Sequence, residues 1–322
     1  MTFRVTRSAA LERDDEEAED LLEMIEQELY QRRFAPVVRV EHGPNPLPGM
    51  LRFLMDELEV GEQEVYETLG EIDAAALSPI CELNLPQLKH RAWVPVTPPV
   101  VADEETNILT IMRNQDLLVH HPYESFVSTV ERFVRTAVDD PKVLAIKMTI
   151  YRTGDNSPFM PLLIQAARAG KQVICVVELT ASFDEERNIY WAQALERAGV
   201  HVIYGIVGLK THGKTILIVR QEPDGLRTYA HIGTGNYHTH TANSYTDMGL
   251  FTCNTEIGED LVDLFHHLTG RSLKTDYKRL LVAPINMRDR FIAMIEREAE
   301  NAAKGLPSGI IMKVNALDEF NI

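Results

Sequence analysis

The chain has 322 residues, of which 45% are hydrophobic and 25% charged, a composition ordinary for a globular protein of about two or three domains. The formal net charge of −16 argues against a general nucleic-acid-binding protein but leaves room for a local basic pocket that takes an anionic substrate. The sequence has no apolar run of roughly 18 residues and no apolar signal-peptide core at its N-terminus, so we expect a cytoplasmic protein.

The first portion of the chain is predicted to be a small α+β unit. The stretches FRVTR (3–7) and VVRVEH (37–42) have the pattern of two short strands. Between them, apolar residues recur at helical spacing, which predicts a helix over about 14–32. A second helix is predicted over about 50–60 and a third after Gly61, and no catalytic signature accompanies these elements.

Proline-rich and then acidic residues at 93–105 (WVPVTPPVVADEE) indicate a linker and a domain boundary. Beyond it, apolar runs alternate with amphipathic stretches. We predict helices over 158–169, 183–198 and 258–268, and strands over 143–152, 171–179, 200–206, 214–220 and 226–232. This alternation predicts a mixed, largely parallel sheet with helices on its faces.

The last portion has the pattern of one strand–helix–strand unit. Strands are predicted over 280–285 and 309–315, and a helix over 286–304. A single unit of this kind cannot bury both faces of its sheet. We therefore expect it to be the start of a further, incomplete domain.

A histidine and a lysine stand two residues apart where the strand 214–220 begins (HGKTILIVR). Neighbours at i and i+2 on an extended strand point to the same side of the sheet. His212 and Lys214 are therefore expected to aim an imidazole and an ammonium at one place. The apolar run that follows is typical of a strand buried on both faces. Taken alone, a histidine before a strand is more often a surface or hydrogen-bonded residue.

A glycine-rich turn follows the next strand, in the stretch HIGTGNYHTHTANSYTD (231–247). The glycines of Gly233-Thr-Gly-Asn236 allow a ligand to approach the backbone closely. Such a turn is common, but its position after a His-x-Lys strand points to phosphoryl transfer. The imidazole would be the nucleophile, and lysine and asparagine donors would hold the charged oxygens of the transferred group.

Several long stretches resemble the long-form polyphosphate kinase family, whose catalytic half is related to the phospholipase D fold. They include LAIKMTIYRTGDNSPF, VVELTASFDEERNI, AGVHVIYGIVGLKTHGK and YAHIGTGNYHTHTANSYTD. The resemblance covers nearly the whole chain and implies an α/β phospholipase D-like mixed sheet with flanking helices, preceded by a partly helical α+β head domain. It implies a partial head-like domain over 1–98, a first catalytic domain over 99–280 and the start of a second catalytic domain over 281–322.

The resemblance also implies roles for five residues. His212 matches the histidine that ATP phosphorylates, and Lys214 and Asn236 complete its half of the site. Tyr245 matches a tyrosine that contacts the nucleotide, although from the residues alone it could simply pack. Arg152 matches an arginine at the phosphate and magnesium site. Because a guanidinium has no lone pair to give a cation, it would bind phosphate oxygens that the metal also touches; it could equally pair with a nearby acid.

One position departs from the family pattern. Many members carry an arginine where this chain has Ser182, in ELTASFDEE. If that arginine shares the phosphate site, this chain holds the metal–phosphate region with one positive charge fewer.

The hypothesis that follows is a polyphosphate kinase. Neutral His212 would attack the γ-phosphate of ATP, with Mg2+ bridging the phosphates, and the phosphoryl group would pass reversibly to polyphosphate. The expected partners are ATP, ADP and inorganic polyphosphate, and not nucleic acid. A homo-oligomer is expected for the full-length protein, and membrane association only as part of a larger complex.

Two other interpretations stay open. A phospholipase D-type phosphodiesterase or phosphatidyl transferase would use the same histidine. Such enzymes usually carry His-x-Lys-x4-Asp, and Val219 stands where that aspartate would be. Alternatively, the chain is a structural or assembly module. Because a phospholipase D-type site needs two His-x-Lys halves and one is found here, we expect little or no turnover from these residues alone.

Overall fold

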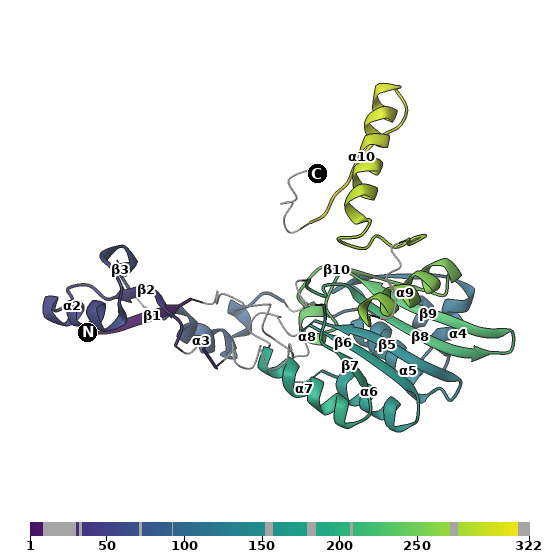
Figure 1. Cartoon of the computed structure of the whole chain (residues 1–322), viewed down its shortest axis with the longest axis horizontal. Coiled ribbons are helices and arrows are strands. Elements are labelled where there is room, and N and C mark those ends of the chain that lie inside the picture. Colours follow the sequence, from purple (N-terminus) through teal and green to yellow (C-terminus); the bar gives the residue numbers. More distant parts are fainter. Residues whose placement is uncertain are drawn as a thin grey trace.

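The computed structural model (Figure 1) describes residues 1–8, 30–31, 34–70, 73–91, 93–151, 157–178, 185–206, 209–270 and 276–314. Most of the helix predicted over 14–32 lies outside these residues, as do Arg152 and Ser182.

A three-stranded sheet organises the N-terminal part of the chain, which lies to one side of the larger sheet in Figure 1. β1 (Phe3–Arg7) pairs antiparallel with β2 (Val37–His42), and β2 pairs parallel with β3 (Val65–Glu67). The first two strands are those predicted. α2 (Pro48–Leu58) confirms the helix predicted over 50–60.

The helix predicted after Gly61 is wrong. A short 3-10 turn (Glu62–Glu64) ends where β3 begins at Val65. β-branched and aromatic residues such as Val65 and Tyr66 suit a strand, and pairing with β2 supplies the hydrogen bonds that make one. The segments that follow are short: a 3-10 turn (Ala74–Leu77), α3 (Ser78–Glu82) and two further 3-10 turns (Pro86–Leu88 and Pro99–Val101).

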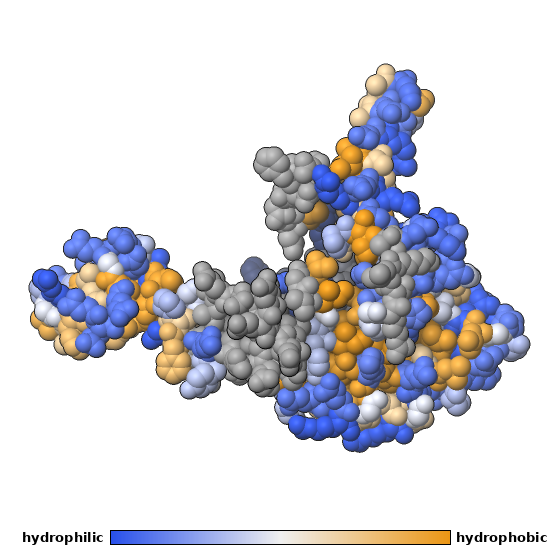
Figure 2. All heavy atoms as spheres, viewed as in Figure 1, coloured by the Kyte–Doolittle hydropathy of each residue, from blue (hydrophilic) through white to orange (hydrophobic). Residues whose placement is uncertain are grey.

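The described residues of this N-terminal part enclose little apolar surface. Among its described residues up to 91, Ala35 and Val40 are the buried apolar side chains, whereas Phe34, Phe53 and Leu69 are exposed. Figure 2 shows apolar residues gathered on its surface. The three strands and α2 therefore pack around a very small core.

A seven-stranded sheet with the order β4-β10-β9-β8-β5-β6-β7 forms the larger part of the chain. All five strands predicted between residues 143 and 232 are confirmed. The seven are β4 (Leu117–His121), β5 (Val143–Ile150), β6 (Gln172–Val177), β7 (His201–Ile203), β8 (Lys214–Glu222), β9 (Gly225–Gly233) and β10 (Asp247–Thr252).

The sheet is mixed, but it is not largely parallel as predicted. β5, β6 and β7 run parallel to one another, whereas β8 pairs antiparallel with both β5 and β9, and β10 with both β9 and β4. The tight turn at Pro223 and Asp224 joins β8 directly to β9, and such a hairpin forces an antiparallel pair. Parallel pairing needs a longer connection, usually a helix, to carry the chain back.

Helices cover both faces of this sheet (Figure 1). Ile216 and Ile218 of β8 lie in a core with α5 and α6, whereas Leu217 lies in a second core with α9. The run predicted to be buried on both faces is therefore confirmed. The helices are α4 (Ile108–Asn114), a π-helical turn (Val127–Glu131) that continues into α5 (Arg132–Asp139), α6 (Phe159–Arg168), α7 (Glu185–Arg197), α8 (Thr239–Ala242) and α9 (Thr255–Leu268).

Beyond the sheet, α10 (Met287–Ala303) confirms the helix predicted over 286–304. The strands predicted over 280–285 and 309–315 are wrong, because 280–285 and the described residues 309–314 have no regular strand structure. The main-chain groups of a strand need a neighbouring strand, and neither segment pairs with one in the described chain. No helix among the described residues combines the length and the apolar character needed to cross a membrane.

Candidate functional site

Two central strands place the His-x-Lys segment. The hydroxyl of Thr149, in β5, donates to the carbonyl of Gly213 at 2.7 Å and accepts from the main-chain N–H of Thr215 at 2.9 Å. Thr149 is buried, so these hydrogen bonds are shielded from water. They bracket Lys214 and fix it at the start of β8, two residues after His212.

Lys214 and His212 meet at the ring of Tyr151. The ammonium nitrogen of Lys214 lies 5.0 Å from the centre of that ring and donates a hydrogen bond to the carbonyl of His212. The imidazole of His212 meets the same ring edge to face, with ring centroids 4.9 Å apart and planes at 83°. The place at which the two side chains converge is therefore defined by a third residue.

Burial changes the protonation of both groups. Lys214 is 5% exposed, and burial lowers the pKa of its ammonium to about 8, although the Asp247 carboxylate acts in the opposite direction. Burial, and next the charge of Lys214, lower the pKa of His212 below its usual value. At neutral pH the imidazole is therefore neutral and keeps a lone pair, beside a lysine that is mostly protonated.

The glycine-rich turn makes room for the carboxylate of Asp247. β9 places Gly233 opposite Lys214 of β8, and β10 is the next strand beyond β9. The hydroxyl of Thr234 donates to Asp247 Oδ1 at 2.8 Å. A Cβ on Gly235 would collide with the same carboxylate, so only glycine lets Asp247 lie over the turn and act on the charge of Lys214.

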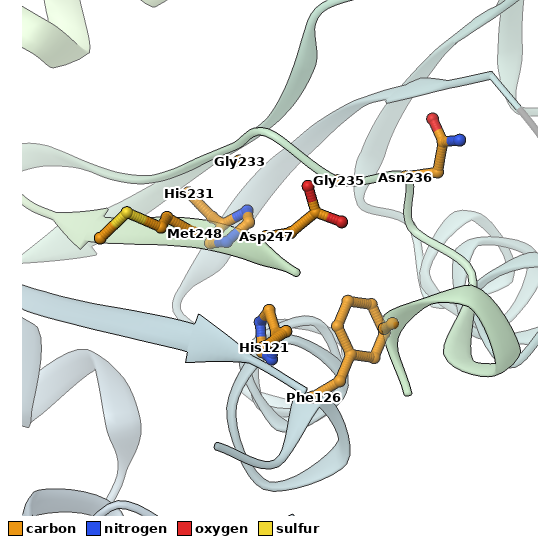
Figure 3. A pocket seen from close by; sticks show the side chains of 9 residues that line it. His121, Phe126, His231, Gly233, Gly235, Asn236, Asp247 and Met248 are labelled. Atoms are coloured by element: carbon orange, nitrogen blue, oxygen red, sulfur yellow. The ribbon is translucent and has the colours of Figure 1, made fainter. Parts of the chain in front are cut away.

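A pocket of about 250 Å³, counting the open solvent at its mouth, lies where β4 and β9 end and β10 begins. In Figure 3, His121 and Phe126 line one side of it, and His231 and Asp247 line the other. Asn236 also lines the pocket, and its buried Oδ1 has no hydrogen-bond partner in the described part of the chain. A buried polar atom in this state is suited to a ligand or an ordered water.

Two buried histidines of the pocket are held neutral. Burial lowers the pKa of His231 to about 3, and its Nδ1 lies 2.8 Å from the hydroxyl of Tyr237. Burial also lowers the pKa of His121, whose Nδ1 lies 2.9 Å from the carbonyl of Glu124. Both rings are fixed by these bonds, and neither belongs to the His-x-Lys segment.

Four of the five residues predicted for the site are described, and all four lie at one end of the sheet. His212 and Lys214 stand where β8 begins, and Asn236 follows the end of β9. Tyr245 lies in the turn before β10 and is 65% exposed, so its ring is open to solvent. Arg152 lies outside the described residues.

Sequence reasoning missed three residues that act on this site. Tyr151 supplies the shared ring, Asp247 a carboxylate over the glycine turn, and Glu178 a second carboxylate whose charge opposes the lowering of the His212 pKa. Tyr151 and Glu178 each follow the last residue of a parallel strand. That position was the available signal, because ligands in α/β sheets gather at the carboxyl ends of such strands.

Within the described ranges, no group of three or more His, Cys, Asp or Glu side chains is placed to hold a metal ion. The described residues therefore contain no preformed set of magnesium ligands. Magnesium that accompanies a nucleotide binds largely to phosphate oxygens and water.

The fold and the site together define a class of protein. A mixed sheet with helices on both faces carries a His-x-Lys pair at the mouth of a central strand and an asparagine after the next strand. These are the features of a phospholipase D-like domain, as the sequence predicted.

The chain belongs to the polyphosphate kinase family. The family's middle domain, C-terminal domain 1 and C-terminal domain 2 match residues 1–80, 107–274 and 280–322. The polyphosphate kinase of Thermosynechococcus vestitus is 46% identical over 99% of this chain, and that of Mycobacterium avium is 50% identical over 98%.

A solved structure agrees with this assignment. The crystal structure of polyphosphate kinase from Porphyromonas gingivalis matches 83% of this chain with a TM-score of 0.71 and 30% sequence identity. The chain spans less than half the length of its relatives: 47% of the Thermosynechococcus protein, 43% of the Mycobacterium protein and 41% of the Porphyromonas chain.

Proposed function

We propose that the protein is a polyphosphate kinase, which transfers the γ-phosphate of ATP reversibly to polyphosphate through a phosphohistidine at His212. The observation that carries this proposal is a neutral imidazole held against the same ring as the buried cation of Lys214. Relatives named polyphosphate kinase, at 46% and 50% identity over nearly the whole chain, support it.

The first half-reaction forms the phosphohistidine. An unprotonated ring nitrogen of His212 attacks the γ-phosphorus of ATP, and a nitrogen–phosphorus bond forms. The bond from that phosphorus to its bridging oxygen breaks, and ADP leaves with the electron pair. The ring becomes a cation because its other nitrogen keeps its proton. In the second half-reaction, a terminal oxygen of polyphosphate attacks the phosphorus and the nitrogen–phosphorus bond breaks. The electron pair of that bond returns to the ring nitrogen, so the ring becomes neutral again.

Two side chains would stabilise the transferred group. Lys214 is protonated below about pH 8 and buried, and a buried cation interacts strongly with phosphate oxygens because little water screens it. Asn236 would donate its amide hydrogens to the same oxygens. Charge neutralisation and positioning are the main contributions that a protein makes to phosphoryl transfer.

The nucleotide would engage two further residues. Tyr245 is proposed to contact it, and its exposed ring offers a face for stacking on the base. Arg152 is proposed to bind phosphate oxygens. Magnesium would arrive with the phosphates of ATP and neutralise part of their charge.

We propose the same domain organisation that the sequence suggested: a partial head-like domain over 1–98, a first catalytic domain over 99–280 and the start of a second over 281–322. The whole protein would act in the cytoplasm as a homo-oligomer on ATP, ADP and polyphosphate. Because one His-x-Lys half lies in this chain, the chain alone would accept a phosphoryl group but turn over little or not at all.

Labelling tests the proposal directly. The chain is incubated with magnesium and ATP labelled in the γ-phosphate, and acid-labile, alkali-stable label is mapped by mass spectrometry. Label is expected on His212, and none in His212→Ala. His201→Ala, which removes an exposed histidine from the edge strand β7, is the matched control and should keep the label. Label retained in His212→Ala would exclude this residue as the nucleophile.

A phosphodiesterase of the phospholipase D type is the second candidate, because the fold class is shared. Incubation with a phosphodiester such as bis(p-nitrophenyl) phosphate distinguishes the two. Cleavage that depends on His212, with no label transferred from ATP, would favour the phosphodiesterase.

A further inference from the structure

A buried carboxylate contacts the segment that carries the proposed nucleophile. Glu178 follows the last residue of β6 and is 4% exposed. Its Oε2 accepts the main-chain N–H of Thr211 at 2.6 Å, across 33 positions of sequence. Thr211 directly precedes His212, so this bond holds the main chain next to His212 at the end of β6.

The same strand end is tied to the ring of Tyr151. The side-chain amide of Asn188, in α7, is fully buried and donates to the carbonyl of Glu178 at 2.8 Å and to that of Tyr151 at 3.0 Å. One amide thus joins the ends of the parallel strands β5 and β6. The Tyr151 ring contacts His212. Asn188 therefore fixes the main chain of both Glu178 and Tyr151, the two residues that position His212.

The charge of Glu178 also reaches the imidazole. Burial, Lys214 and Lys210 lower the pKa of His212, and Glu178 raises it. Among the described residues, the groups that act on or contact the imidazole are these two lysines, the Glu178 carboxylate and the Tyr151 ring. Within that set, Glu178 is the negative charge that counteracts the two lysines.

The negative charge is what distinguishes this side chain from a neutral acceptor. A glutamine could accept the same Thr211 N–H through its carbonyl oxygen, but it would bring no negative charge toward His212.

We propose that Glu178 is a positioning residue for phosphoryl transfer: it holds His212 in place through Thr211, and its charge stabilises the ring cation that exists while His212 carries the phosphoryl group. This inference rests on the proposed function. The step makes a nitrogen–phosphorus bond and releases ADP with the electron pair of the broken bond, so the ring gains one positive charge. A carboxylate nearby lowers the energy of that cation relative to the neutral ring, and so favours the phosphorylated state.

Two substitutions of Glu178 separate the effect of its hydrogen bond to Thr211 from the effect of its negative charge. Glu178→Gln keeps an acceptor for the Thr211 N–H but removes the charge. Glu178→Asp keeps the charge but shortens the side chain, which weakens the bond to Thr211. The matched control is Glu222→Gln, which neutralises a buried carboxylate at the opposite end of the nine-residue strand β8.

Two measurements follow on each variant, once circular dichroism shows it to be folded like the wild type. The first is the NMR titration of the His212 ring, assigned by the loss of its signal in His212→Gln. The second is the amount of acid-labile label from ATP as a function of pH. The titration does not depend on activity, so it tests the link between Glu178 and His212 even if labelling fails.

For Glu178→Gln we expect two effects, one on the pH range in which label forms and one on the maximal amount of label. The titration midpoint of His212 moves to lower pH, so the acid limb of labelling extends to lower pH. The maximal label falls about tenfold, because the phosphorylated cation has lost its counter-charge. Lost packing alone would lower the label without moving either the titration or the acid limb. Glu222→Gln is expected to behave as the wild type in both measurements.

The outcomes distinguish this inference from the proposed function. No label in the wild type would remove the proposed function, whereas normal label in the wild type and in Glu178→Gln, with an unchanged His212 titration, would overturn the role of Glu178. Should Glu178→Gln fail to fold, Glu178→Asp decides. Reduced label with a nearly unchanged titration midpoint supports the holding role, and wild-type label overturns it.

Discussion

The ammonium nitrogen of Lys214 lies 5.0 Å from the centre of the Tyr151 ring, and Tyr151 directly follows the last residue of β5. A cation held against an aromatic ring away from water gains about 1–2 kcal/mol from the ring's quadrupole. The same ring meets the imidazole of His212. Tyr151 therefore sets the relative position of the proposed nucleophile and the proposed phosphate-binding cation.

Removing this ring should impair phosphohistidine formation. We expect Tyr151→Leu to form about tenfold less acid-labile label from ATP, the loss that corresponds to roughly 1.4 kcal/mol. Tyr151→Phe restores the ring and should restore most of the label. An equal loss in both variants would show that the hydroxyl, and not the ring, is what the site needs.

Lys214 should lower the stability of the fold that holds it. Burial shifts the pKa of its ammonium from 10.5 to about 8, which corresponds to about 3 kcal/mol, offset in part by its hydrogen bond to His212. Lys214→Met is therefore expected to raise the free energy of unfolding at pH 7 by about 1–3 kcal/mol and to abolish the label.

The pH dependence of this gain has a definite sign. Between about pH 8 and 10.5 the unfolded chain keeps the Lys214 proton that the folded chain has lost, so wild-type stability rises with pH in this window. The advantage of Lys214→Met should be largest below pH 8 and shrink as pH approaches 10.5. Urea unfolding of both proteins at pH 7 and pH 10 measures it, and a constant difference would contradict the shifted pKa.

Phosphohistidine formation should follow a bell-shaped pH profile. On the acid side, protonation of His212 removes the nucleophile, at a pH below the usual range because burial and Lys214 lower its pKa. On the alkaline side, Lys214 loses its proton near pH 8 and holds the phosphate oxygens less well. Initial labelling rates at low ATP, from pH 5 to 9.5, give both limbs.

Lys214→Arg identifies the alkaline limb. Arginine stays protonated throughout this range, so the limb should vanish from the profile whatever activity remains. An alkaline limb that persists near pH 8 in Lys214→Arg would assign it to another group.

Gly235 is needed for the position of Asp247. A Cβ at this position would overlap the Asp247 carboxylate, so we expect Gly235→Ala to lose about 1–3 kcal/mol of stability and more than tenfold of the label. Gly309→Ala, whose Cβ would meet open space, is the matched control.

A double variant tests the cause of that loss. Gly235→Ala combined with Asp247→Ala removes the overlapping atoms and should recover much of the stability but not the label. Additive losses of stability in the double variant would show that the two residues do not interact.

Most elements of the larger sheet could be predicted because hydrophobic periodicity reports local backbone state. The run in β8 is an example, since Ile216 and Leu217 enter different cores as its pattern indicated. The direction of strand pairing could not be predicted in the same way. It depended on the two-residue turn after Glu222 and on β10 inserting between β4 and β9.

Pairing partners also explain the wrong elements. The residues after Gly61 became β3 because β2 runs beside them, whereas 280–285 and 309–314 pair with no strand in the part of the chain that the structure describes. In each case the local pattern was compatible with more than one conformation. The segment formed a strand where a neighbouring strand paired with it, and it formed none where the described chain offers no such partner.

By itself, the sequence determined that a His-x-Lys pair precedes a buried strand, that a Gly-x-Gly-Asn turn follows the next strand, and that the chain resembles polyphosphate kinases. These are contiguous patterns, which need no knowledge of distant neighbours. Only the tertiary structure decided that Tyr151, Glu178 and Asp247 surround this pair. Strand pairing brings these three residues to the pair from distant parts of the sequence. The absence of a side chain on Gly235 leaves the space that Asp247 occupies. Periodicity records which face of a strand a side chain takes, but it does not record which distant strand lies beside it.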